Sequence, residues 1–465
     1  MKNTGHDMDK LIKKLQAIVG EAFVSDAAEE RYLYSMDQGT MPPAAPDAVV
    51  MPKTADQVVQ IVRLANELKV PLVPMGGGLV LSGLTRALKG GVIVDMKRMD
   101  TIIEVNPASR YVVVEAGVTQ GKLKAYLAKH HPDLKHSMPD APPAATIAGN
   151  VCIHGSGHLS VLGGFHSDML TGLEVVLPTG EIVRTGSCSV SDKWFAKAPL
   201  PDLSGLFLGW SGTTGFVTKL GIRLFPNYRH NDVLVYVCET ADKMPEIIYR
   251  LTSAQVAEDM TPWMTPKPEW ARGFFHINIA FGAHSKKELI FKRNLLQESV
   301  RPITETKAAG FLPIPPVQKA RFLEIPSPDL ARFADARKGG GFEYVGAIMA
   351  IERFAEAYAQ GTKIAEKYHT TYSLGARIIG AGHAMMFFFA YAFNRADSDD
   401  VDRAAAALEE TNRACLEMGG IPWKAEAPAQ KEILKQMDPG TAALMDRLRN
   451  TLDPNRIMNP GNWEI

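Results

Sequence analysis

The chain has 465 residues, of which 46% are hydrophobic, so it can build more than one hydrophobic core. Its 51 basic and 51 acidic residues give a formal charge of zero, and the field that drives general binding to nucleic acid or to an anionic membrane is missing. We therefore expect no nucleic-acid partner, a small-molecule ligand and two substantial lobes.

The first ten residues are too polar for a secretion signal, which requires an apolar central stretch. The longest uncharged run, residues 378–393, is too short for a membrane span. These features predict a cytoplasmic protein without a membrane span, although attachment through a partner stays open. Four widely separated cysteines lack the close pairs that ligate zinc or iron–sulfur clusters, which predicts free thiols and no metal.

Local signals in the first half predict short strands and helices. Thr54 can cap a helix whose apolar face includes Val58, Ile61 and Val62. Two pairs of strands flank short turns, Asn-Pro-Ala-Ser in one case and Pro-Thr-Gly in the other, as in hairpins. The predicted strands are residues 70–73, 101–105, 111–115, 173–177, 181–185 and 216–225.

The most informative segment is residues 74–83, which follow an apolar strand and contain four glycines and no acidic group. Glycine lets the main chain approach a ligand closely, and successive amide N–H groups can form a concave site for anions. Similar turns follow at 146–150 and 211–215, and three such loops suit one long, phosphate-bearing cofactor. The first loop fits neither the dinucleotide fingerprint nor a Walker loop, which disfavours NAD binding and ATP hydrolysis.

After Asn227 the pattern changes to longer helical stretches, such as 287–298 and 401–417. We place the boundary between the two lobes at this point.

The arrangement resembles the FAD-linked oxidases of the vanillyl-alcohol oxidase and p-cresol methylhydroxylase type, a superfamily that includes D-lactate and glycolate dehydrogenase flavoprotein subunits. The resemblance implies an α+β fold of two lobes: residues 1–227 bind FAD, residues 228–435 form an α/β substrate domain, and residues 436–465 return to the FAD domain. The segments that carry it are 48–58, 74–83, 91–96, 139–141, 148–150, 211–215 and 452–461.

The resemblance implies non-covalent FAD, because the glycine loop lacks the histidine to which some relatives attach the cofactor; attachment through the cap domain stays open. His154, His158 and His166 fall in a loop that lines the cofactor in this superfamily, and without an evident fourth ligand we do not expect zinc. The implied FAD contacts are Pro74, Met75, Gly76, Gly77, Gly78, Leu79, Ser82, Gly83, Pro139, Asp140, Ala141, Thr146, Ile147, Gly149, Asn150, Gly212, Gly215, Phe216, Val217 and Asn459.

In the second lobe the resemblance divides between two branches. The D-lactate and glycolate branch usually carries a His-Ala-Gly-Asp-Gly-Asn-x-His metal segment, but residues 382–390 keep only its first histidine, which disfavours a metal-assisted 2-hydroxy acid site. Residues 337–344 are similar to a Trp-Arg-Gly-Gly-Gly-Gly segment of the alkylphenol and aryl-alcohol branch. Trp423 and Lys424 fall where that branch has a Tyr-Arg pair beside the flavin.

Four side chains are candidates for catalysis. The charge of Lys424 would stabilise the anionic reduced flavin, unless this lysine is simply solvated. Trp423 could stack against a substrate or fill the core. His383 could accept a hydroxyl proton or be a buried structural histidine. Arg377 could hold a carboxylate with two hydrogen bonds or pair at the surface.

The resemblance predicts a flavoprotein dehydrogenase that oxidises a small hydroxyl-bearing or p-hydroxybenzylic molecule by hydride transfer to flavin N5. It also implies a protein electron acceptor, such as a cytochrome, an iron–sulfur subunit or an electron-transfer flavoprotein, with oxygen as an alternative. A homodimer is compatible with it. Two other functions stay open: a D-2-hydroxy acid dehydrogenase without the usual metal, and a non-catalytic FAD subunit that relays electrons.

Overall fold

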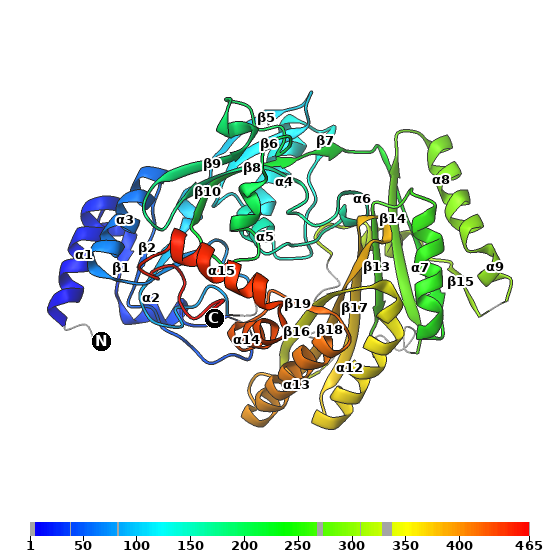
Figure 1. The fold of residues 1–465 in the computed structure, drawn as a ribbon. Coiled ribbons are helices and arrows are strands. Elements are labelled where there is room, and N and C mark those ends of the chain that lie inside the picture. Colours follow the sequence, from blue (N-terminus) through cyan, green and yellow to red (C-terminus); the bar gives the residue numbers. More distant parts are fainter. Residues whose placement is uncertain are drawn as a thin grey trace.

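The computed structural model describes residues 5–37, 39–80, 83–266, 273–306, 308–327 and 337–464. Figure 1 shows two lobes, one built from the blue to dark-green part of the chain, which includes β10, and the other from the bright-green to orange part. Each lobe has its own hydrophobic core. The predicted α+β fold with two lobes is confirmed, whereas our exact domain limits at 227 and 435 stay predictions.

The first lobe contains a four-stranded sheet in the order β1-β2-β4-β3 and a five-stranded antiparallel sheet in the order β5-β6-β10-β8-β9. Thr54 caps α3 by accepting a hydrogen bond from the Gln57 amide at 3.2 Å, as its position predicts. Strand β3 runs parallel to β4 and ends at Met75, so the glycine loop leaves a buried sheet. The elements are α1 (Gly5–Val19), β1 (Val24–Ser25), α2 (Ala28–Leu33), β2 (Ala48–Val50), α3 (Ala55–Leu68), β3 (Leu72–Met75), β4 (Val92–Asp95), β5 (Ile102–Asn106), β6 (Tyr111–Glu115), α4 (Gln120–His130), β7 (Leu134–Lys135), α5 (Ile147–Cys152), α6 (Ser160–Gly163), β8 (Leu170–Val176), β9 (Ile182–Gly186), β10 (Phe216–Arg223) and β11 (Phe225–Pro226).

The second lobe is built on an eight-stranded sheet in the order β15-β12-β14-β13-β17-β18-β16-β19. Side chains alternate between its faces, as strand geometry requires. On β18, Phe387, Phe389 and Tyr391 belong to the core that α7, α8, α12 and α13 cover, whereas Phe388 and Ala390 face a cavity. The elements are β12 (His230–Cys238), α7 (Met244–Ser253), β13 (Asp259–Met264), β14 (Phe275–Ala283), α8 (Lys286–Ser299), α9 (Arg301–Thr304), β15 (Ala309–Leu312), α10 (Pro316–Phe322), β16 (Gly340–Met349), α12 (Phe354–Tyr368), β17 (Thr371–Ile379), β18 (Ala384–Asn394), α13 (Ser398–Glu417) and β19 (Ile421–Trp423).

The end of the chain returns to the first lobe after α14 (Ala427–Gln436) and α15 (Pro439–Leu452), drawn in red in Figure 1. The Asn459 amide donates to the Leu72 carbonyl at 2.8 Å, and the Asn459 side chain donates to the carbonyls of Leu84 and Ser211. Asn459 therefore ties the 211–215 turn, and the residue that follows the first glycine loop, to the amino-terminal end of β3. No helix within the described ranges is long and apolar enough to cross a membrane.

Candidate active site

A cavity of about 390 Å³ lies where the two lobes meet. In the first lobe it is bounded by the three glycine turns, and in the second by the face of the large sheet that the helices leave uncovered. The predicted cofactor residues that line it are Pro74, Met75, Gly76, Gly77, Gly78, Leu79, Pro139, Asp140, Ala141, Thr146, Gly149, Asn150, Gly212, Gly215, Phe216 and Val217.

The other predicted cofactor residues lie elsewhere. Ile147 is buried in the core of the first lobe, and Asn459 joins loops instead of lining the cavity. Gly83 is also absent from the cavity wall, and its amide donates to Asp37 at 2.8 Å. Ser82 lies outside the described residues.

The glycine loop can lie with its backbone against a phosphate-bearing cofactor. Its glycines pack so closely against a neighbouring turn that side chains would not fit there. A Cβ atom on Gly77 would lie 2.9 Å from the Ala144 carbonyl oxygen, and one on Gly76 would lie 2.4 Å from Thr146 Oγ1. Gly78 has φ +66°, which disfavours any residue with a side chain. The loop thus presents bare backbone to the cavity, as a bound diphosphate would need.

Aromatic rings form the cavity wall on β16, β18 and β19. The ring centroids of Tyr344 and Phe388 are 5.2 Å apart in an edge-to-face arrangement, and Phe388 lies 6.3 Å from Trp423. Phe342 continues this wall on β16, its ring 6.4 Å from that of Tyr344. Such a wall suits an apolar or aromatic ligand.

Lys424 follows β19 with φ +44° and brings a positive charge to the aromatic wall. Its Nζ atom is 4.3 Å from the Tyr344 ring centroid and 4.9 Å from that of Trp423, at the distance of a cation–π interaction. Trp423 is half-buried and donates from Nε1 to the Ile153 carbonyl of the first lobe. Both side chains line the cavity, so the structure brings this predicted pair together.

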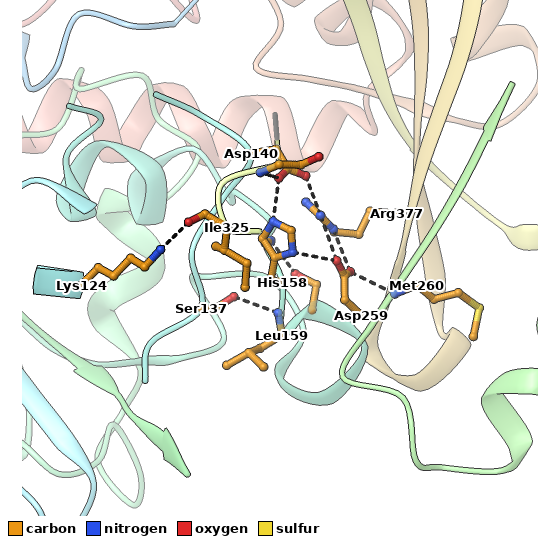
Figure 2. Close-up of polar contacts among 12 residues, drawn as sticks. Lys124, Ser137, Asp140, His158, Leu159, Asp259, Met260, Ile325 and Arg377 are labelled. Carbon is orange, nitrogen blue, oxygen red and sulfur yellow. Dashed lines mark hydrogen bonds and ion pairs between the residues drawn. The ribbon is translucent and has the colours of Figure 1, made fainter. Parts of the chain in front are cut away.

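A network of four charged side chains joins the two lobes at the cavity wall (Figure 2). Asp140 and His158 come from loops of the first lobe, and Asp259 and Arg377 from β13 and β17. His158 Nε2 lies 2.6 Å from Asp140 Oδ1, and His158 Nδ1 lies 3.3 Å from Asp259 Oδ2. Arg377 donates from Nε and Nη2 to the two oxygens of Asp259, at 3.0 and 3.1 Å, and from Nη2 to Asp140 at 2.8 Å.

Mutual attraction fixes the charges of this network. Burial opposes the charged form of His158, but Asp140 and Asp259 outweigh it and raise the histidine pKa to about 9. Burial likewise opposes ionisation of the two aspartates, yet the charges of His158 and Arg377 hold both carboxyl pKa values below their usual range. At neutral pH the network therefore contains two cations and two anions.

His383 and Arg377, two of the candidate catalytic side chains, differ in their exposure to solvent. His383 follows the turn after β17 as an exposed side chain and is not part of the cavity wall, so the buried structural role that the sequence left open is wrong. Arg377 lies in the cavity wall but is buried, which excludes the surface pairing that the sequence left open. Its guanidinium group already holds two carboxylates of this chain.

The other clustered histidines bind uncharged groups. Burial lowers the pKa of His166 to about 3, and its Nε2 lies 2.8 Å from Ser137 Oγ. His154 Nδ1 lies 2.8 Å from Ser167 Oγ. Across the residues that the structure describes, no group of three or more His, Cys, Asp or Glu side chains could hold a metal ion, and the four cysteines are free.

Sequence reasoning missed the role of His158 and did not consider Asp259. Asp259 follows Glu258 at the start of β13, 118 positions from its partner Arg377. No local signal marks such a pair.

Comparison with known proteins identifies the two domains. Residues 46–186 match the FAD binding domain, and residues 349–463 match the C-terminal domain of FAD linked oxidases. The chain carries both domains of the FAD-linked oxidases. The resemblance seen in the sequence is confirmed, and FAD is the cofactor of the domain at residues 46–186.

Proteins similar in sequence to this chain come from both the D-lactate branch and the alkylphenol branch. The chain is 34% identical to the mitochondrial D-lactate dehydrogenase [cytochrome] of Arabidopsis thaliana over 49% of its own length and 39% of the relative. It is 30% identical to the 4-cresol dehydrogenase [hydroxylating] flavoprotein subunit of Pseudomonas putida over 48% of its own length and 44% of the relative. These alignments span less than half of either curated relative.

The fold agrees with a solved structure along its whole length. The crystal structure of p-cresol methylhydroxylase with substrate bound superposes with a TM-score of 0.87, covering 100% of this chain and 98% of that one at 21% identity. This match confirms the p-cresol methylhydroxylase type of fold.

Proposed function

We propose that this chain is an FAD-dependent dehydrogenase that oxidises a small, uncharged hydroxyl-bearing or p-hydroxybenzylic molecule. The observation that carries the proposal is the aromatic wall of Tyr344, Phe388 and Trp423 with Lys424 beside it. A phenyl ring would pack edge-to-face against these rings. When bound, FAD would supply N5 as the hydride acceptor.

Lys424 would act through its charge. Reduction adds negative charge to the flavin, and a cation fixed beside the ring system favours that change without needing to move. The cation–π contacts with Tyr344 and Trp423 hold Nζ in this position. The resemblance that places a cation near flavin N1 supports the same role.

Asp140 would orient the substrate hydroxyl. Its side chain keeps 23% of its surface exposed, more than those of His158, Asp259 and Arg377. Because His158 and Arg377 hold Asp140 ionised, its carboxylate can accept a hydrogen bond but takes up a proton poorly. His158 would keep its own proton throughout. His383 lies outside the cavity wall, so we do not propose it as the base, and the proton of the substrate hydroxyl would pass to solvent water.

We infer that electrons leave through a protein acceptor, such as a cytochrome, an iron–sulfur subunit or an electron-transfer flavoprotein. The resemblance supports this inference, since cysteine pairs for a cluster of its own are missing from the sequence. Non-covalent attachment of FAD belongs to the same proposal, and denaturation should release the yellow cofactor into the supernatant.

An anaerobic substrate screen tests the proposal. The visible flavin band of the purified holoenzyme is followed after addition of 4-alkylphenols, aryl alcohols, D-lactate or glycolate. Bleaching by the first two classes supports the proposal. Bleaching by the hydroxy acids alone would replace it with a metal-free D-2-hydroxy acid dehydrogenase, and no bleaching by any donor would favour an electron-relay subunit.

A further inference from the structure

Arg377 is the only arginine in the described part of the cavity wall, and this chain already occupies it. Its guanidinium group binds Asp259 through Nε and Nη2 and also reaches Asp140 from Nη2. Arg377 is 4% exposed and Asp259 is also 4% exposed. Two parallel, charge-assisted hydrogen bonds between a guanidinium group and a carboxylate are among the strong hydrogen bonds of proteins.

The surroundings of this pair would repel a second carboxylate. Asp140 and Asp259 place two negative charges beside Arg377, and His158 balances them from the opposite side. An incoming carboxylate would have to displace Asp259 and lie close to Asp140. In the cavity wall that the structure describes, Lys424 is the one cation outside the network, and its Nζ lies over the aromatic wall.

We propose that Asp259 determines substrate charge: by holding Arg377 it closes the cavity to carboxylate-bearing molecules and reserves it for uncharged alcohols or phenols. The proposal deepens the function proposed above and rests on the cavity being the substrate site. Asp259 is a specificity-determining residue in this view and takes no part in hydride transfer.

The proposal predicts a gain of binding when the charge of Asp259 is removed. Asp259→Asn keeps the size of the side chain but removes one negative charge beside Arg377. The carboxylate of a ligand can then take the place of the lost charge. Asp259→Glu retains the charge and is the matched control. In Asp259→Asn/Arg377→Met the cation that would receive the ligand is absent, so the gain should disappear.

The experiment titrates FAD-loaded protein with benzoate and, separately, with benzyl alcohol, and follows the shift of the flavin absorbance band. We expect wild type and Asp259→Glu to bind benzoate at least tenfold more weakly than benzyl alcohol. Asp259→Asn should bind benzoate at least tenfold more tightly than wild type, with little change for benzyl alcohol. Equal benzoate affinity in wild type and Asp259→Asn would overturn the proposal, as would a gain that persists in the double variant.

The wild-type titration also stands alone if Asp259→Asn does not accumulate as folded holoenzyme. Competitive benzoate binding to wild type with the affinity of benzyl alcohol would refute carboxylate exclusion without any variant. The two proposals fail separately. If no alcohol or phenol bleaches the flavin, the proposed reaction is wrong, whereas bleaching by alcohols together with tight benzoate binding refutes only the role of Asp259.

Discussion

The charge on His158 should make the stability of the protein depend on pH in a defined alkaline window. The pKa of His158 rises from 6.5 in an unfolded chain to about 9 in the folded protein, although burial opposes the charge, because Asp140 and Asp259 bind the imidazolium ring. A group whose pKa is raised by folding stabilises the folded state fully below its unfolded pKa and loses that contribution as the pH rises through the folded value. A difference of one in pKa corresponds to about 1.4 kcal/mol, so the raised pKa of His158 contributes roughly 3 kcal/mol to the free energy of unfolding.

The assay compares equilibrium urea unfolding of wild type and His158→Gln in excess FAD, from pH 6.5 to above about pH 9. Glutamine cannot titrate, so the stability difference between the two proteins should shrink by about 3 kcal/mol across this window. The aspartates titrate at far lower pH, and despite its burial their charges raise the pKa of Arg377 above its usual range, so neither kind of group changes charge in the window. A difference that is constant with pH would refute an imidazolium ring held between two carboxylates.

Three further predictions concern the cofactor loop, the cation and the thiols. Gly77→Ala should lower FAD occupancy at least tenfold, because its Cβ would lie 2.9 Å from a backbone carbonyl oxygen, whereas Gly205→Ala, with nothing within 4 Å, should leave the yellow colour unchanged. Lys424→Ala should slow flavin reduction in stopped-flow experiments by roughly two to three powers of ten, with Lys424→Arg largely retaining the rate; unchanged reduction in the alanine variant would remove Lys424 from the site. Burial raises the pKa of Cys152 to about 12, and all four cysteines are free, so Ellman's reagent should react slowly with the native protein and with four thiols after unfolding.

The features that the sequence predicted well depend on neighbouring residues. The cap at Thr54, the hairpins of the five-stranded sheet and the glycine loop after β3 are all where local turn and periodicity signals indicated. Each of these structures is determined by a few neighbouring residues, so short sequence patterns are enough to predict it. Trp423 and Lys424, which the resemblance pairs, are adjacent in the chain, and both line the cavity.

His383 shows where such reasoning fails. Its neighbours in sequence are apolar and glycine-rich, yet the strand that follows it begins only at Ala384, and the turn leaves the imidazole exposed. Apolar neighbours along a chain do not bury a side chain when the backbone turns away from the core. The face on which a turn residue lies depends on the sheet and the helices around it, which the local sequence does not specify.

The charged network could not be predicted from local sequence, because it forms only in the complete fold. Arg377 meets Asp140 across 237 positions and Asp259 across 118, and the three residues come from a loop of the first lobe and two strands of the second. Because an isolated buried charge is very costly, Arg377 can face the inside of the molecule only with carboxylates beside it, and these come from Asp259 of its own lobe and Asp140 of the other. The contact between the two lobes therefore contributes to the charge balance of the cavity wall. A change at Asp259 should consequently alter the charge of the cavity wall and, with it, the ligands that the cavity accepts.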